Sequence, residues 1–189
     1  MLRLEKARAE DFADVFPLIK ALWSYNSYDE EATRKVFKHI AESESSFAFV
    51  AREYAESAAG AEIAAYVELT GPAGTAPAGQ ACAVPAGQTC QPVTVPASSA
   101  GRVVGFCHGD YFPTLWMCGE TCYLSGIITE EHEQGRGIGT KMLEHVKALA
   151  ALRGCKAIIL ESGLQRKAAH QFYEAHGFEK SCYGFECVL

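Results

Sequence analysis

Residues 134–140 read Gln134-Gly135-Arg136-Gly137-Ile138-Gly139-Thr140 and join two segments of different character. The segment before them, residues 123–129, is largely apolar and typical of a strand. After them, apolar residues recur at helical spacing until Gly154, which favours a helix end. The pattern predicts a glycine-rich turn that leads from a strand into a helix whose first N–H groups have no partner. Such an N-terminus, where glycines let a ligand approach the backbone, predicts binding of a phosphate or pyrophosphate.

The spacing of these glycines excludes two common phosphate-binding loops. A P-loop ends in Gly-Lys-Ser/Thr, whereas Lys141 here follows Thr140 and precedes Met142. A dinucleotide-binding fingerprint has the spacing G-x-G-x-x-G in an early βαβ unit, whereas these glycines run G-x-G-x-G late in the chain. Residues 134–139 match a different pattern, Gln/Arg-x-x-Gly-x-Gly/Ala.

A second motif follows the loop. Residues 168–178 read Ala-Ala-His-Gln-Phe-Tyr-Glu-Ala-His-Gly-Phe, and an apolar strand candidate at 156–161 lies between the two motifs. Together they resemble the GNAT superfamily of acetyl-CoA-dependent N-acetyltransferases, which has a helix of pattern A-x-x-F-Y-E-x-x-G-F. The resemblance covers nearly the whole chain apart from one insertion, and it is strongest from Tyr123 to Phe178.

The resemblance implies an α/β fold of GNAT type in three layers. Its sheet should be mixed and mainly antiparallel, with helices on both faces. Two central strands, at residues 122–129 and 156–161, should run parallel and splay apart to admit the cofactor.

The remaining elements are predicted from periodicity and capping residues. They are a strand near Leu2 and Leu4, a helix from Asp11 to Trp23, a helix capped by Asp29 that runs through Val36, Phe37 and Ile40, strands from Phe47 and from Arg102 to Phe112, and a final hairpin or strand pair from Phe178 to Leu189. Pro17 is expected to be tolerated only near the first turn of its helix.

The stretch from Tyr54 to Gly101 is rich in Ala, Gly, Pro, Ser and Thr, where the resembled family needs only a short hairpin turn. Its prolines exclude a long regular helix. We therefore expect one domain, residues 1–189, with an insertion at about 55–101. Three roles stay open for the insertion: a tolerated surface loop, an arm that packs on a second subunit in a homodimer, or a cap over the substrate. Pairing of Cys82 and Cys90 within it also stays open.

Composition bounds the class of protein. A chain of 189 residues with 49% apolar residues suits one core, and a net charge of −6 argues against a nucleic-acid partner while agreeing with a cationic amine substrate. No signal peptide and no run of membrane-spanning length is evident, so we expect no membrane association and a cytoplasmic location. The eight cysteines form no C-x-x-C pair, so we expect no metal site and, outside the insertion, reduced and mostly buried thiols.

The resemblance also indicates how the co-substrate acetyl-CoA binds. The main chain of Ile127, Ile128 and Thr129 should pair with the pantetheine arm, much as an added strand would. The pyrophosphate should lie on the loop from Gly135 to Thr140, with Gln134 folded over it. Arg166 stands where the family often has an Asn, and its guanidinium could hold a cofactor phosphate, with Ser162 as an alternative cap of the following helix.

Tyr173 aligns with the family tyrosine that faces the cofactor sulfur. When an amine attacks the thioester, the tetrahedral intermediate expels a thiolate. A phenol with a pKa of about 10 can donate a proton to that thiolate, because the conjugate thiol lies at about 8.5. Tyr173 is therefore the predicted catalytic acid.

The general base is less defined. Many family members place a carboxylate eight or nine residues before the glycine motif, which here falls on Gly126 and Ser125. Glu120 lies further back and would need a long or bulged strand to reach the site. Ser125 could hold a water molecule, and His108 with Asp110 offers another relay.

Substrate specificity in the family is set by the first two helices, their connecting loop and the C-terminal strands. Trp23, Tyr25, Tyr28 and His108 are the candidate substrate residues, and Asp29 with its neighbours would attract a cation unless it only caps a helix. The resemblance implies an acyltransferase that moves an acetyl group directly to the primary amine of a small molecule. The alternatives are a protein or peptide amine acetyltransferase and a non-catalytic acyl-CoA-binding module.

Overall fold

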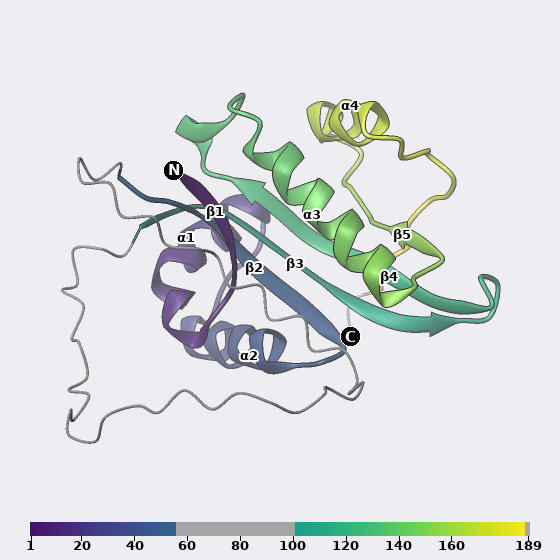
Figure 1. Ribbon diagram of the computed structural model, residues 1–189, viewed down its shortest axis with the longest axis horizontal. Helices are drawn as coiled ribbons and strands as arrows, with labels where there is room; N and C mark the ends of the chain where they lie inside the picture. The colour runs from purple at the N-terminus through teal and green to yellow at the C-terminus, as the bar shows by residue number, and fades with distance from the viewer. Residues whose placement is uncertain (56–100, 188–189) are drawn as a thin grey trace, which may run out of the picture. The chain divides into compact units, whose positions relative to one another are not determined.

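The computed structural model describes residues 1–55 and 101–187, which contain one sheet with the strand order β1-β2-β3-β4-β5 (Figure 1). The strands are β1 (Leu2–Lys6), β2 (Ser46–Glu53), β3 (Arg102–Thr114), β4 (Gly119–Thr129) and β5 (Ala157–Ile159). Neighbouring strands are antiparallel except β4 and β5, which are parallel. The predicted insertion, with Cys82 and Cys90, lies outside the described residues.

Helices cover both faces of this sheet (Figure 1). Helices α1 (Phe12–Leu22) and α2 (Glu30–Glu42) pack on one face, which we call the α1/α2 face, and α3 (Ile138–Arg153) packs on the other. The short helix α4 (Lys167–Ala175) lies beside the start of α3, where a Cβ at Gly139 would be 3.7 Å from the Phe172 ring. The predicted fold class is confirmed.

Each face of the sheet has its own apolar core, built from side chains that alternate along the strands. On the α1/α2 face, Phe12 and Val15 of α1 pack with Phe106 of β3, and all three are at most 2% exposed. On the α3 face, Met142 and Val146 are fully buried in a second cluster. Burial of an aromatic or aliphatic side chain contributes about 1.5–3 kcal/mol, so these two clusters hold the helices in place.

The predicted helix caps are confirmed. The Asp29 carboxylate accepts a hydrogen bond from the Ala32 amide at 3.0 Å, which satisfies one of the orphan donors of α2. Gly154 ends α3 in the left-handed region with φ of 79°, which glycine adopts without strain.

Two expectations, about α1 and β5, are wrong or incomplete. Pro17 lies beyond the first turn of α1, and burial of the apolar face of this helix offsets the lost hydrogen bond. The strand expected at residues 156–161 is only three residues long.

The predicted C-terminal hairpin is absent from the described residues 178–187. Tyr183 and Phe185 are 83% and 96% exposed, so this segment has no apolar surface against which a strand could pack. The expectation of mostly buried cysteines fails here too. Cys182 and Cys187 lie in this exposed segment and Cys118 lies in the β3–β4 turn, whereas Cys107 and Cys122 are buried.

Candidate active site

The parallel strands β4 and β5 separate part-way along β4. Their ladder pairs Thr121 with Ala157, Cys122 with Ile158 and Tyr123 with Ile159, and it ends there. The second half of β4, from Leu124 to Thr129, therefore has β3 on one side and no described strand on the other. An unpaired strand edge offers backbone N–H and C=O groups to an extended ligand. Ile127, Ile128 and Thr129, the predicted pantetheine residues, lie on this edge.

The glycine loop carries an uncapped helix N-terminus. Gly135 and Gly137 have φ of 78° and 75°, and a Cβ on either would meet nothing within 4 Å. Gly137 is the N-cap of α3 without a side-chain cap, and the first helical hydrogen bond runs from Lys141 to Gly137. The amides of Ile138, Gly139 and Thr140 therefore lack helical acceptors, as an anion site requires. Open space above left-handed glycines fits a pyrophosphate group.

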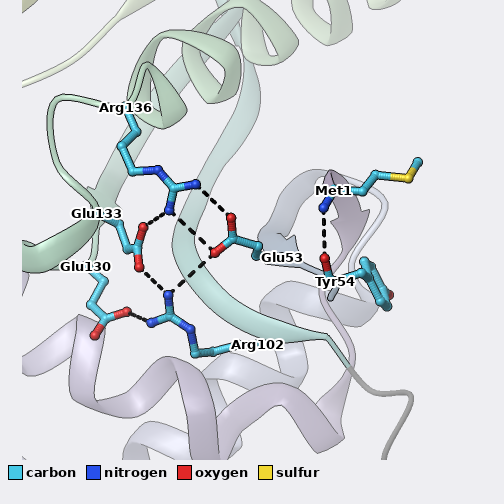
Figure 2. A network of polar contacts seen from close by, with 7 residues as sticks. All are labelled: Met1, Glu53, Tyr54, Arg102, Glu130, Glu133 and Arg136. Atoms are coloured by element: carbon cyan, nitrogen blue, oxygen red, sulfur yellow. Dashed lines mark hydrogen bonds and ion pairs between the residues drawn. The ribbon is translucent and has the colours of Figure 1, made fainter. Parts of the chain in front are cut away.

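A network of ion pairs surrounds this loop (Figure 2). Glu133, which precedes the loop and is only 9% exposed, accepts hydrogen bonds from both Arg102 and Arg136. Arg136 also donates to Glu53 at 2.8 Å, and Arg102 donates to Glu130. Hydrogen bonds from Arg102 and Arg136 lower the pKa of Glu133, so the carboxylate stays charged at neutral pH. The network ties the loop to the ends of β2 and β3.

Tyr173 lies on α4 against the core of the α3 face. It packs with Phe172 and Phe178, at ring-centroid distances of 5.5 and 5.8 Å. Burial raises the pKa of its phenol, which the Arg166 charge partly opposes. The hydroxyl makes no hydrogen bond to any other described residue, so its proton is available for a ligand. His176, which follows the last residue of α4, links this helix to α3 through a 3.2 Å contact between its Nε2 and the Thr140 hydroxyl.

A cluster of polar side chains lies on the α1/α2 face near the point where β4 and β5 separate. Its members are Ser46, His108, Asp110 and Ser125. Asp110 on β3 accepts hydrogen bonds from Ser46 at 2.7 Å and Ser125 at 3.2 Å. His108, two residues earlier on the same face, stacks on Phe106 and meets the Trp23 ring edge at a centroid distance of 5.8 Å. Burial lowers the pKa of His108 to about 4, an effect that the Asp110 charge opposes. The imidazole is therefore neutral at pH 7.

The predicted substrate residues fall into two groups. Trp23 touches His108, and the Tyr28 hydroxyl donates to the Trp23 carbonyl at 3.0 Å. Tyr25 is 75% exposed and no aromatic contact holds it among the described residues. The loop between α1 and α2 thus brings Trp23, Tyr28 and His108 together and leaves Tyr25 at the surface.

Glu120 does not lie with the other catalytic candidates. It pairs with Pro113 near the start of β4, five positions before Ser125, and accepts a hydrogen bond from Arg153 at 2.8 Å. A strand rises about 3.3 Å per residue, so Glu120 is some ~16 Å from Ser125 along β4. The bulge in this strand does not bring it closer, because the extra residue is Ser125 itself.

Two further expectations concern the start of α4. Ser162 does not cap this helix: the N-cap is Arg166, which makes no side-chain cap bond. The Ser162 hydroxyl is buried and has no hydrogen-bond partner among the described residues. Arg166 is close enough to Tyr173 to lower its pKa, so it lies beside the predicted site.

Sequence reasoning missed Glu53, Arg102, Glu133 and Ser46. Glu53 and Arg102 flank the insertion and are far apart in the sequence from the loop, so only the paired strands bring them to Arg136. Glu133 directly precedes the motif, and its place there was the one available signal. No group of three or more potential metal ligands gathers in residues 1–55 and 101–187.

Residues 12–178 match the model of the Acetyltransferase (GNAT) family. The chain belongs to this family. The predicted family is confirmed. Because GNAT proteins are acyltransferases, the predicted enzyme class is confirmed with it. Within the described ranges, none of the helices of this GNAT protein has the length and apolar character needed to cross a membrane.

Individual relatives of this GNAT protein are distant. An uncharacterized N-acetyltransferase, YhdJ, from Bacillus subtilis (strain 168) is 34% identical over 68 residues, which cover 35% of this chain and 48% of that protein. The match thus spans about half the length of this relative.

Solved structures resemble the fold over the whole chain. A transcriptional regulator from Bacillus halodurans C-125 has a TM-score of 0.66 at 18% identity, with full coverage of both chains. The aminoglycoside N-acetyltransferase AAC(6')-Iy in complex with CoA has a TM-score of 0.66 at 13% identity, covering 100% of this chain and 95% of that one. The aminoglycoside acetyltransferase meta-AAC0020, from an uncultured soil metagenomic sample and in complex with sisomicin, has a TM-score of 0.61 at 13% identity, covering 100% and 96%. At such identities the likeness concerns the fold alone.

Proposed function

We propose that this GNAT protein transfers an acetyl group from acetyl-CoA directly to the primary amine of a small molecule. The observation that supports it most is the separation of β4 and β5 after Tyr123, on the strand that leads to a glycine loop whose first helix amides lack helical acceptors. The free edge of β4 suits the pantetheine arm and the loop suits the pyrophosphate. The solved AAC(6')-Iy structure, which has the same fold, contains CoA.

In this proposal Tyr173 donates the proton that the departing thiolate requires. Burial raises the pKa of its phenol, so the group is protonated at neutral pH and can act as an acid. The amine nitrogen attacks the thioester carbonyl, and the adduct then breaks its C–S bond while Tyr173 protonates the sulfur. Arg166, Gln134 and the loop amides would hold the phosphates, with no part in the bond-making step.

The side of the sheet where the amine would enter supports a small substrate. Trp23 packs on His108 over Gly126, and the Tyr28 hydroxyl fixes the Trp23 carbonyl. This closes part of the α1/α2 face near the site, whereas a peptide needs an open groove. The meta-AAC0020 structure, which shares the fold, contains the aminoglycoside sisomicin. Both observations favour a small-molecule amine over a protein amine.

The experiment uses the purified chain with acetyl-CoA and three sets of acceptors: small polyamines and aminoglycosides, free amino acids, and peptides with lysine or a free N-terminus. Release of free thiol is followed in each. Turnover on a small amine, with little on peptides, supports the proposal. Turnover on peptides alone would establish a protein acetyltransferase instead. Tight acetyl-CoA binding by calorimetry without turnover would establish a binding module.

A further inference from the structure

A β-bulge directs two consecutive β4 residues, Ser125 and Gly126, toward the α1/α2 face. His108 pairs with Gly126 and Gly109 pairs with Leu124, so Ser125 is an extra residue in β4. Ser125 donates a hydrogen bond to Asp110, while Leu22, His108 and Trp23 pack closely over Gly126. The bulge therefore directs both positions toward the polar cluster that contains His108 and Asp110. This cluster lies just past the last β4–β5 pair, at Tyr123.

The ring of His108 is held by packing alone. Its Nδ1 is buried and has no hydrogen-bond partner among the described residues. A Cβ at Gly126 would lie 3.1 Å from His108 Nε2 and 3.1 Å from the Trp23 ring. Because Gly126 has no side chain, Nε2 faces the bare β4 backbone. A buried imidazole without a partner costs free energy, which points to a role in the site rather than in the core.

Asp110 is fixed beside this ring. Its two oxygens accept hydrogen bonds from Ser46 and Ser125, one each. The carboxylate therefore cannot turn away, and its charge favours the protonated form of His108. The other residues that pack on the ring, Phe106 and Trp23, carry no charge, and neither does Gly126.

Building on the proposed function, we propose that His108 takes the proton from the attacking amine, that Trp23 positions its ring by packing and that the Asp110 charge polarises it. The amine arrives neutral after losing a proton to solvent. A C–N bond forms as the carbonyl electron pair moves to oxygen, and the nitrogen becomes cationic. His108 removes one N–H proton from this adduct, which is far more acidic than the free ammonium ion.

The remaining steps close the cycle. The oxygen electron pair re-forms the C=O bond, the C–S bond breaks with its electrons on sulfur, and Tyr173 protonates the thiolate. His108 then gives its proton to water, and Tyr173 recovers one from water. The net change converts an ammonium ion and acetyl-CoA into an amide, free CoA and one proton. Because His108 is neutral at pH 7, its ring lone pair is available for this step.

The test measures steady-state turnover of an accepted amine by the full chain and by the variants His108→Gln, His108→Ala and His145→Gln. His145 is the matched control, since it is another partly buried histidine with a pKa lowered by burial, on the opposite face against Phe49. We expect His108→Gln to lower kcat by about 100-fold with the KM for acetyl-CoA nearly unchanged, because a general base contributes about 10²–10⁴-fold. His145→Gln should keep kcat.

Added imidazole should restore turnover of His108→Ala in proportion to the concentration of its neutral form, which a purely structural role would not produce. Turnover of folded His108→Gln within about threefold of the parent would overturn the inference, as would absence of any rescue. If neither His108 variant folds, Asp110→Asn decides, since a folded variant with unchanged kcat would contradict the role of the pair. Failure of the parent chain to acetylate any amine would instead refute the proposed function.

Discussion

Tyr123 on β4 and Ile159 on β5 form the last pair of the parallel ladder, and beyond them the two strands separate. Strand β4 continues to Thr129, the glycine loop begins five residues later at Gln134, and Tyr173 packs on the α3 face of the same sheet. Because the ladder has only three pairs, the rest of β4 keeps an edge without a described strand partner on the way to the glycine loop.

Gly137 should matter for acetyl-CoA binding and Gly154 should not. Both are left-handed, at φ of 75° and 79°, and both have open space where a Cβ would lie. Alanine at either costs about 1–2 kcal/mol of backbone strain. We expect Gly137→Ala and Gly154→Ala to lower the thermal midpoint similarly, and only Gly137→Ala to weaken acetyl-CoA binding in calorimetry. Equal acetyl-CoA affinities in the two variants would show that the glycine loop does not bind the cofactor.

Tyr173→Phe should lower kcat by about 100-fold, the contribution of a general acid, with little change in acetyl-CoA affinity. Burial raises the pKa of Tyr173 above 10, so the acid is present throughout neutral pH and is lost only as pH rises through that raised value. The parent rate should therefore hold to higher pH than an ordinary tyrosine would allow.

Tyr111→Phe is the control for this prediction. Tyr111 is also half-buried, its pKa is raised to about 12 mainly by burial, and it packs under Arg153. Its removal should leave kcat unchanged. Loss of turnover in both variants to the same degree would show that packing, rather than proton donation, explains the effect.

Glu133→Gln should weaken acetyl-CoA binding several-fold, because Glu133 holds Arg102 and Arg136 around the loop. The pKa of Glu133 is lowered from 4.5, so the effect should be full at neutral pH and fade as pH falls below that value toward the lowered pKa. Glu120→Gln breaks an exposed ion pair with Arg153 and should change neither binding nor kcat. A large loss of kcat in Glu120→Gln would restore Glu120 as a catalytic candidate.

Asp29 tests whether the acidic start of α2 attracts substrate or only caps the helix. Asp29→Ala removes the oxygen that accepts from Ala32 and should cost about 1 kcal/mol of unfolding free energy. Asp29→Asn keeps a capping oxygen without the charge, so its stability should be near that of the parent. Neither variant should alter the KM for the amine. A raised KM in both would show that the charge guides the substrate.

Local patterns predicted most of the fold. The alternation around Phe47, the helical spacing after Ile138 and the caps at Asp29 and Gly154 depend on neighbours in the sequence, so they could be read directly. The C-terminal hairpin could not, because alternation near Phe185 says nothing about whether a surface exists to bury it.

The residues of the candidate site also fall into those that a local pattern predicts and those that only strand pairing brings together. The loop and Tyr173 lie in contiguous motifs, so the sequence alone was enough to propose them as site residues. The ties of Arg136 to Glu53 and of Ser46 to Asp110 depend on strand register, which brings residues 83 and 64 positions apart into contact. The bulge at Ser125 is also a property of register, and it decides which β4 side chains face His108.

The most direct test of the account is to incubate the parent chain with acetyl-CoA carrying an isotopically labelled acetyl group and an amine panel, and to identify products by mass spectrometry. We predict one labelled acetyl group on a primary amine of a small molecule, formed in equal amount with free CoA. Free CoA without any acetylated amine, or label only on peptides, would contradict the account.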